Sequence, residues 1–267
     1  MNPQLFVVDA FTGQPFAGNP AGVCLLDHPC SEAWMQSFAA EMKHSETAFL
    51  LPEGDGYRLR WFTPASEVDL CGHATLASAH ILFETGRLGQ DEQAHFLTRS
   101  GLLTAGLRDG CVELNFPASY ISPAQAPDGM FEALGIQQAR FVGKTPFDYL
   151  IELEEGQDIR SLAPDFRALK SVEARGVIVT KREPGQAHDF VSRFFAPRVG
   201  VDEDPVTGSA HCALGPYWGQ KLGKTDMSAY QASPRGGHLR VRLDGDRVLL
   251  AGQAVTIFKA ELAIPAG

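Results

Sequence analysis

The chain contains an internal repeat whose two copies are 136 residues apart, and this repeat restricts the fold more than any other feature. Gly72 lies within residues 69–74, and Gly208 lies 136 positions later within residues 204–210. Further pairs match at the same offset, and they are Gly101 with Gly237, Leu107 with Leu243, Val112 with Val248 and Leu114 with Leu250. Because chance rarely preserves one spacing through so many pairs, the sequence predicts two structurally related halves.

Each half is predicted to contain several strands, one peripheral helix and one central helix. Strand candidates flank a helical pattern twice, at 21–26, 32–42 and 47–51 and again at 149–153, 159–169 and 176–180. The central helices are expected to begin at Gly72 and Gly208 and to end near Gly86 and Gly223. The first of them is small or apolar nearly all round, which is typical of a helix buried on most sides.

These patterns favour an α+β fold of two pseudo-symmetric lobes, each a curved and mostly antiparallel sheet wrapped around its central helix. The lobes are expected at residues 1–117 and 129–267, with the last strand able to cross back to the first lobe. The segment 117–128 is rich in Pro, Ala and Ser and is predicted to be the linker.

Charge and cysteine usage exclude several classes of protein. The chain has 23 Lys plus Arg against 32 Asp plus Glu, a formal charge of −9, which argues against nucleic acid as a partner. No apolar stretch approaches the roughly 18 residues of a membrane span, and the first residues do not resemble a secretory signal. The 5 cysteines are odd in number and lack the spacing of a metal knuckle. We therefore expect a cytoplasmic protein with no disulfide framework and no membrane contact.

The two central helices place their N-termini, at Gly72 and at Gly208, at equivalent points of the repeat. We expect them to face each other across a cleft between the lobes, where their unpaired N–H groups would bind a carboxylate or an enolate. In the alternative interpretation these glycines only allow tight packing at a strand-to-helix turn. The site would need no metal.

Two acidic residues lie where chemistry could occur. Glu46 stands between a helical pattern and an apolar strand, where burial could raise its pKa enough for acid or base catalysis. Alternatively it is a solvated turn residue. Asp204 precedes a helix and is either a cap or an acceptor that orients a ligand.

Three further side chains lie next to the helix-opening glycines. His73 could donate a proton or hydrogen bond to the substrate, or be a core histidine bonded to a carbonyl. Ser209 could touch substrate or only cap its helix. Cys71 could be a nucleophile or base, although a buried small residue is the preferred interpretation, because Thr207 occupies the place where a two-thiol epimerase needs its second thiol.

Several motifs are absent from the sequence. There is no phosphate-binding P-loop, no dinucleotide-binding glycine fingerprint, no H-E-x-x-H and no G-x-S-x-G elbow, and the 8 histidines form no spaced cluster. No cofactor and no metal are therefore expected.

Five segments together resemble the PhzF-like phenazine biosynthesis family, in order and from about residue 6 to the end. They are residues 9–12, 15–20, 45–49, 69–75 and 203–211. The resemblance implies the diaminopimelate epimerase-like fold, two lobes with the active site between them, and a homodimer.

The resemblance also implies a cofactor-free isomerase in which a glutamate moves a proton between carbons of a small anionic substrate. Glu46 matches the catalytic acid/base, and His73, Asp204 and Ser209 match the residues beside it. The expected substrate-binding residues are Asn19, Gly72, Thr207 and Gly208. Two alternatives stay open, an amino-acid-like epimerase or racemase with Cys71 or Asp204 as second base, and a binding protein that has lost its chemistry.

Overall fold

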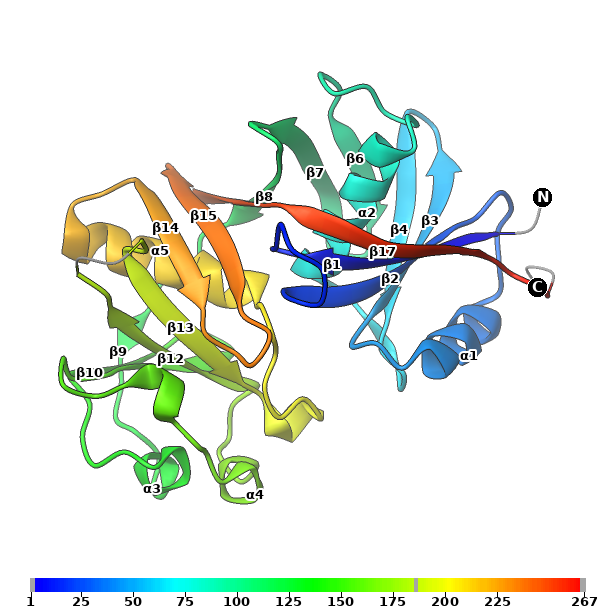
Figure 1. Cartoon of the computed structure of the whole chain (residues 1–267). Helices are drawn as coiled ribbons and strands as arrows, with labels where there is room; N and C mark the ends of the chain where they lie inside the picture. The colour runs from blue at the N-terminus through cyan, green and yellow to red at the C-terminus, as the bar shows by residue number, and fades with distance from the viewer. Residues whose placement is uncertain (1–2, 185–186, 265–267) are drawn as a thin grey trace. The chain divides into compact units, whose positions relative to one another are not determined.

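The computed structural model describes residues 3–184 and 187–264, and the chain divides into two compact units (Figure 1). The first unit comprises Met1–Phe116 and Leu250–Gly267, and the second comprises Pro117–Leu249. In the first unit, strand β17 (Ala254–Glu261) pairs antiparallel with β1 (Gln4–Ala10). Two separate stretches of sequence therefore build one sheet.

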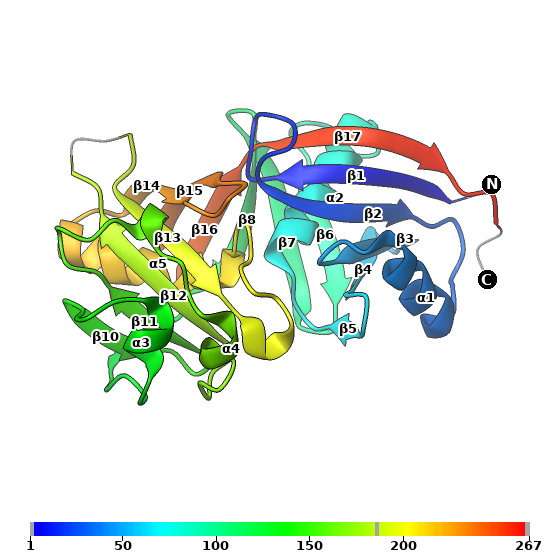
Figure 2. The ribbon, with the colours of Figure 1, turned by 60° about the horizontal axis from the view of Figure 1, so that its bottom comes forward.

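The first unit is dominated by its sheet, in which β1 lies between β17 and β2 (Figure 2). Its other strands are β2 (Asn19–Leu25), β3 (Thr47–Glu53), β4 (Gly56–Phe62), β5 (Glu67–Val68), β6 (Ala94–Thr98), β7 (Gly101–Arg108) and β8 (Cys111–Pro117). Neighbouring strands pair antiparallel except for β2 with β3 and β4 with β6. Parallel pairs need crossover connections, and helices α1 (Glu32–Met42) and α2 (Gly72–Glu84) lie in these two crossovers.

The second unit follows the same order of pairing. Its strands are β9 (Ser122–Pro123), β10 (Phe141–Lys144), β11 (Asp148–Glu152), β12 (Gly176–Arg182), β13 (Phe190–Phe195), β14 (Asp226–Gln231) and β15 (Gly237–Asp244), and β16 (Arg247–Gly252) follows them and spans the boundary between the units. The pairs are antiparallel except β11 with β12 and β13 with β14. Helix α5 (Gly208–Leu222) lies in the second crossover. Along the chain, each unit thus has two antiparallel strands, a crossover, two more antiparallel strands, a crossover that contains a helix, and then a hairpin.

The offset of 136 residues recurs in the structure. Helices α2 and α5 begin at Gly72 and Gly208, strands β7 and β15 begin at Gly101 and Gly237, and strands β8 and β16 begin at Cys111 and Arg247. Equal spacing of three element starts shows that the repeat extends to the secondary structure of both units.

Helix α2 is buried on most sides in the first unit. It packs against β1, β2, β3 and β7, and its Leu76 and Ile81 are fully buried. Its small hydroxyl residues are buried with a hydrogen-bond partner one turn earlier: Thr75 Oγ1 donates to the carbonyl of Cys71 at 2.6 Å and Ser78 Oγ to that of Ala74 at 2.7 Å. No helix within the described residues has the length and apolar character that a membrane crossing needs.

Two expectations from the sequence are wrong in the second unit. Residues 159–169 do not form one helix but a 3₁₀ turn at Ile159–Ser161 and a single turn, α4 (Phe166–Leu169). Pro164 lies between these two turns and prevents one continuous helix, because proline lacks an N–H and disfavours helical backbone in the residue before it.

The segment 117–128 is not a separate linker. It belongs to the second unit, and its strand β9 pairs with β10 through Pro123 opposite Gly143. The backbone N–H of Ala118 also donates to the carbonyl of Asp246. The second unit therefore begins at residue 117 rather than 129, and it is followed by α3 (Met130–Leu134).

Candidate active site

Glu46 stands at the entry to a central strand of the first unit. Helix α1 ends with Lys43 in the left-handed conformation at φ 55°, and β3 begins one residue after Glu46. The carbonyl of Glu46 accepts from the N–H of Gly22 at 3.2 Å, which extends the pairing of β3 with β2. The backbone of Glu46 is therefore fixed by the sheet, while its side chain remains 19% exposed.

The start of α2 places two more polar side chains nearby. Cys71 is the residue before the helix, with extended backbone at φ −143° and ψ 109°, and Gly72 and His73 are the first two helical residues. The first N–H groups of a helix have no carbonyl partner within it, so they give this end of α2 partial positive charge. Both Cys71 and His73 are nearly buried there, 6% and 5% exposed.

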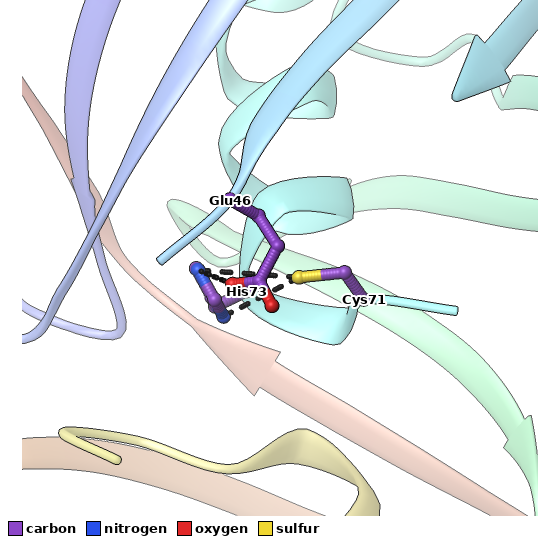
Figure 3. Close-up of side chains that lie close together, drawn as sticks. All are labelled: Glu46, Cys71 and His73. Carbon is purple, nitrogen blue, oxygen red and sulfur yellow. Dashed lines mark hydrogen bonds and ion pairs between the residues drawn. The ribbon is translucent and has the colours of Figure 1, made fainter. Parts of the chain in front are cut away.

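The ring of His73 contacts four polar side chains, and Figure 3 shows three of the residues pointing toward one another. Its Nε2 lies 3.4 Å from Oε2 of Glu46 and 3.4 Å from Oγ of Ser45. On the other edge, Nδ2 of Asn19 lies 3.2 Å from Nδ1 and Sγ of Cys71 lies 3.5 Å from Nδ1. A neutral ring that accepts the Asn19 amide hydrogen bond at Nδ1 carries its proton on Nε2, on the side of the carboxylate. The ring of this buried histidine therefore contacts the polar side chains of the candidate site.

Burial and hydrogen bonding act in opposite directions on Glu46. Burial raises the pKa of Glu46, and hydrogen bonds from Ser45 and Cys71 oppose part of that rise. The net direction is upward because desolvation disfavours the charged carboxylate. A carboxyl with a raised pKa can take up and release a proton nearer neutral pH than a solvated glutamate.

The second unit has a polar cluster of its own at the start of α5. Thr207 is the residue before the helix, and its hydroxyl donates to Oδ2 of Asp204 at 2.5 Å. Gln231 of β14 is fully buried and fixes both residues: its Oε1 accepts from the N–H of Thr207 at 2.9 Å, and its Nε2 donates to the carbonyl of Asp204 at 2.7 Å. A buried amide with its donor and acceptor both used makes this turn rigid.

Ser209 lies inside α5 as its second residue, so the prediction that it only caps the helix is wrong. Its hydroxyl accepts from Nη2 of Arg175 at 3.1 Å, and Nε of Arg175 donates to Asp148 at 2.9 Å. The arginine links Ser209 to a buried carboxylate and places positive charge beside the start of the helix.

The structure groups the expected residues by unit. Glu46, His73, Asn19 and Gly72 lie together in the first unit, and the second unit brings together its own set of expected residues, which are Asp204, Thr207, Gly208 and Ser209. Ser45, Arg175 and Gln231 were not predicted as site residues. Ser45 had a signal, its position next to Glu46, whereas Gln231 belongs to no motif and acts only through the position of β14.

The structure defines a sheet-dominated mixed α/β protein in which a glutamate, a histidine and a cysteine meet at the N-terminus of a buried helix. A model of the phenazine biosynthesis-like protein family, PhzC-PhzF, matches residues 8–260, and the chain belongs to this family.

Relatives and solved structures agree with that assignment. An uncharacterized isomerase of Halalkalibacterium halodurans is 52% identical over 99% of this chain and 100% of its own length. The crystal structure of a PhzF-family protein of Enterococcus faecalis has a TM-score of 0.93 at 40% identity and covers 99% of this chain and 100% of that chain. A hydroxyproline epimerase of Agrobacterium vitis shares the fold at a TM-score of 0.66, with 14% identity and coverage of 99% and 92%.

Proposed function

We propose that this protein is a cofactor-free isomerase that moves a proton between two carbons of a small carboxylate substrate, with Glu46 as the acid/base. The observation that carries the proposal is the contact between Oε2 of Glu46 and Nε2 of His73, 3.4 Å apart beside the start of α2. The isomerase name of the relative from Halalkalibacterium halodurans supports the class of reaction.

The proposed reaction conserves all atoms of the substrate. The substrate carboxylate binds the N–H groups at the start of α2, near Gly72. The Glu46 carboxylate removes a proton from a carbon made acidic by conjugation, and the C–H electron pair becomes delocalised toward the substrate carboxylate. The protonated Glu46 then returns the proton to a different carbon of the conjugated system. His73 orients Glu46 and donates a hydrogen bond to it.

For the second unit, we propose that the N–H groups of Gly208 and Ser209 form an anion-binding site. Arg175, held by Asp148, adds positive charge beside Ser209. Asp204 and Thr207 fix the turn from which these N–H groups project. Ser209→Ala is expected to weaken anion binding at this site, because it keeps the backbone N–H but removes the hydroxyl that accepts from Arg175.

An epimerase with Glu46 and Cys71 as its two bases fits the geometry less well. Two bases that each reach one carbon from opposite faces lie about 5–6 Å apart or more, since each heavy atom approaches within about 3 Å. The carboxylate oxygen, the thiol sulfur and a ring nitrogen of His73 all lie within 4.8 Å of one another. This spacing favours one base that acts on one face of the substrate.

Proton NMR in deuterated water tests the proposal, with a panel of small unsaturated and cyclic carboxylic acids. We expect the wild type to incorporate deuterium into at least one compound and Glu46→Gln to lose that exchange while keeping its fold. Glu41→Gln is the matched control, because Glu41 lies on α1 with an exposed side chain. Exchange that survives in Glu46→Gln excludes Glu46 as the base, and binding without exchange in the wild type supports a binding protein instead.

A further inference from the structure

The three residues of Figure 3 offer three different metal-ligating atoms at one point. Cys71, the residue before α2, supplies Sγ, and His73 within the helix supplies Nε2. Glu46, at the entry to β3, supplies Oε2. Sγ lies 3.9 Å from Nε2, and Nε2 lies 3.4 Å from Oε2. All three residues place a ligand atom within 4.8 Å of the others. We propose that Glu46, Cys71 and His73 form a binding site for Zn²⁺, and that the bound ion inhibits the protein.

Two of the three ligand separations are close to those of a tetrahedral zinc site. With Zn–S of about 2.3 Å, Zn–N of about 2.0 Å and Zn–O of about 2.1 Å, neighbouring ligands lie roughly 3.4–3.6 Å apart. The pair Nε2 and Oε2 already has this separation, and the pair Sγ and Nε2 exceeds it by a few tenths of an ångström. The third separation, between Sγ and the Glu46 carboxylate, is within 4.8 Å, so the Cys71 side chain has to rotate toward the carboxylate to bring the three atoms around one ion.

The donor set balances the charge of a dication, even though the first N–H groups of α2 add partial positive charge at this point. A thiolate from Cys71 and the carboxylate of Glu46 together neutralise the two charges of Zn²⁺, so the occupied site has no net charge. This matters because Cys71 and His73 are nearly buried, and a buried net charge is costly.

Asn19 already holds the ring of His73 from the opposite edge. Its side-chain amide lies 3.2 Å from Nδ1. When Nε2 binds a metal, Nδ1 carries the ring proton, and the Asn19 amide can turn its oxygen to accept it. A hydrogen bond to the second ring nitrogen is the usual support for a metal-bound histidine.

The donor set selects the ion and predicts its effect. Sulfur and imidazole prefer Zn²⁺ or Co²⁺ to Mg²⁺ or Ca²⁺, which prefer oxygen. Three protein ligands leave a fourth position for water or an anion. An ion on Glu46 occupies the carboxylate that the proposed reaction needs, so the metal acts as an inhibitor. Binding itself is measured without substrate, so this inference can fail or succeed independently of the proposed function.

The test is a Co²⁺ titration of the metal-free full-length chain, followed by displacement with Zn²⁺. We expect one Co²⁺ per chain with a near-ultraviolet thiolate charge-transfer band, which Zn²⁺ abolishes and Mg²⁺ does not. Cys71→Ser should lose the band and bind Zn²⁺ at least about tenfold more weakly. The absence of a band in the wild type, or its persistence in Cys71→Ser, overturns the proposal.

A Cys30→Ser/Cys111→Ser double variant is the matched control. It removes the two partly exposed thiols and leaves Cys71, together with the buried Cys24 and Cys212. The band should persist in it at full stoichiometry. This control decides the question even if Cys71→Ser does not fold, because loss of the band in the double variant assigns the ligand to another thiol and refutes the site.

Discussion

Oε2 of Glu46 lies 3.4 Å from Nε2 of His73, although the two residues belong to different elements of the first unit. The contact exists because β3 and α2 pack against each other and each residue stands at the start of its element. The position of the carboxylate is therefore coupled to the packing of α2, and substitutions that turn the His73 ring should change the chemistry of Glu46.

Asn19→Ala should lower the rate of proton exchange without preventing folding. It removes the amide that lies 3.2 Å from Nδ1 of His73, and loss of one buried hydrogen-bond partner costs about 1–3 kcal/mol. We expect kcat for deuterium exchange to fall about tenfold or more, with the far-ultraviolet circular dichroism spectrum unchanged. Equal kcat in the variant and the wild type would show that Asn19 does not orient the ring.

Gln231→Leu should destabilise the protein. The substitution leaves the N–H of Thr207 and the carbonyl of Asp204 without the amide that bonds them, in a place where Gln231 is fully buried. We expect the free energy of unfolding to fall by about 2–3 kcal/mol in a urea titration. Gln220→Leu, at an exposed position of α5, is the control and should change it by less than about 0.5 kcal/mol. Similar losses in the two variants would contradict the assigned role.

His211 should make stability depend on pH in mildly acidic solution. Burial lowers the pKa of His211 to about 4, although its Nδ1 lies 2.8 Å from the carbonyl of Thr207. Between about pH 6.5 and pH 4 the unfolded chain therefore binds a proton that the folded chain does not. The free energy of unfolding should fall by about 3 kcal/mol as the pH is lowered through this window. Above about pH 6.5 His211 is neutral in both states, and this stability is fully retained.

Urea unfolding of the wild type and His211→Gln at several pH values isolates this contribution. The variant should lose less stability than the wild type between pH 7 and pH 4.5, because glutamine does not titrate. Parallel curves for the two proteins would mean that other groups cause the acid sensitivity.

Leu76→Ala should be costly because α2 is buried on several sides. Leu76 has no exposed surface, and a cavity of leucine size in such a place costs about 2–5 kcal/mol. Leu102→Ala on β7, where the leucine is 59% exposed, is the matched control, with an expected change under about 0.5 kcal/mol. If chemical denaturation gives equal losses, α2 does not form the core of its unit.

Local signals in the sequence were sufficient for much of the fold. The helix predicted at 32–42 is α1 with the same bounds, and the helices predicted to begin at Gly72 and Gly208 do so. Glycine and apolar spacing act within a few residues, so they are visible without knowledge of the tertiary structure. The prediction for 159–169 is wrong because Pro164 interrupts the helix that the apolar spacing indicates, and the proline is a local signal too.

The candidate site was less accessible from sequence. The motifs contained Glu46, Cys71 and His73, but the contact of Cys71 with Glu46 depends on how β3 packs beside α2. The role of Gln231 depends on the pairing of β14 with β13, which places its amide at the start of α5. Contacts of this kind arise from strand order, and neither the spacing nor the type of these residues reveals them.

The pairing of β17 with β1 also has a consequence for the order of events during synthesis. The ribosome makes β1 early, then all of Pro117–Leu249, and only afterwards the strand that completes the first sheet. The second unit is one continuous stretch and can fold as it emerges, whereas the edge of β1 stays open until β17 arrives. In the growing chain, that open edge is the surface most in need of protection from aggregation.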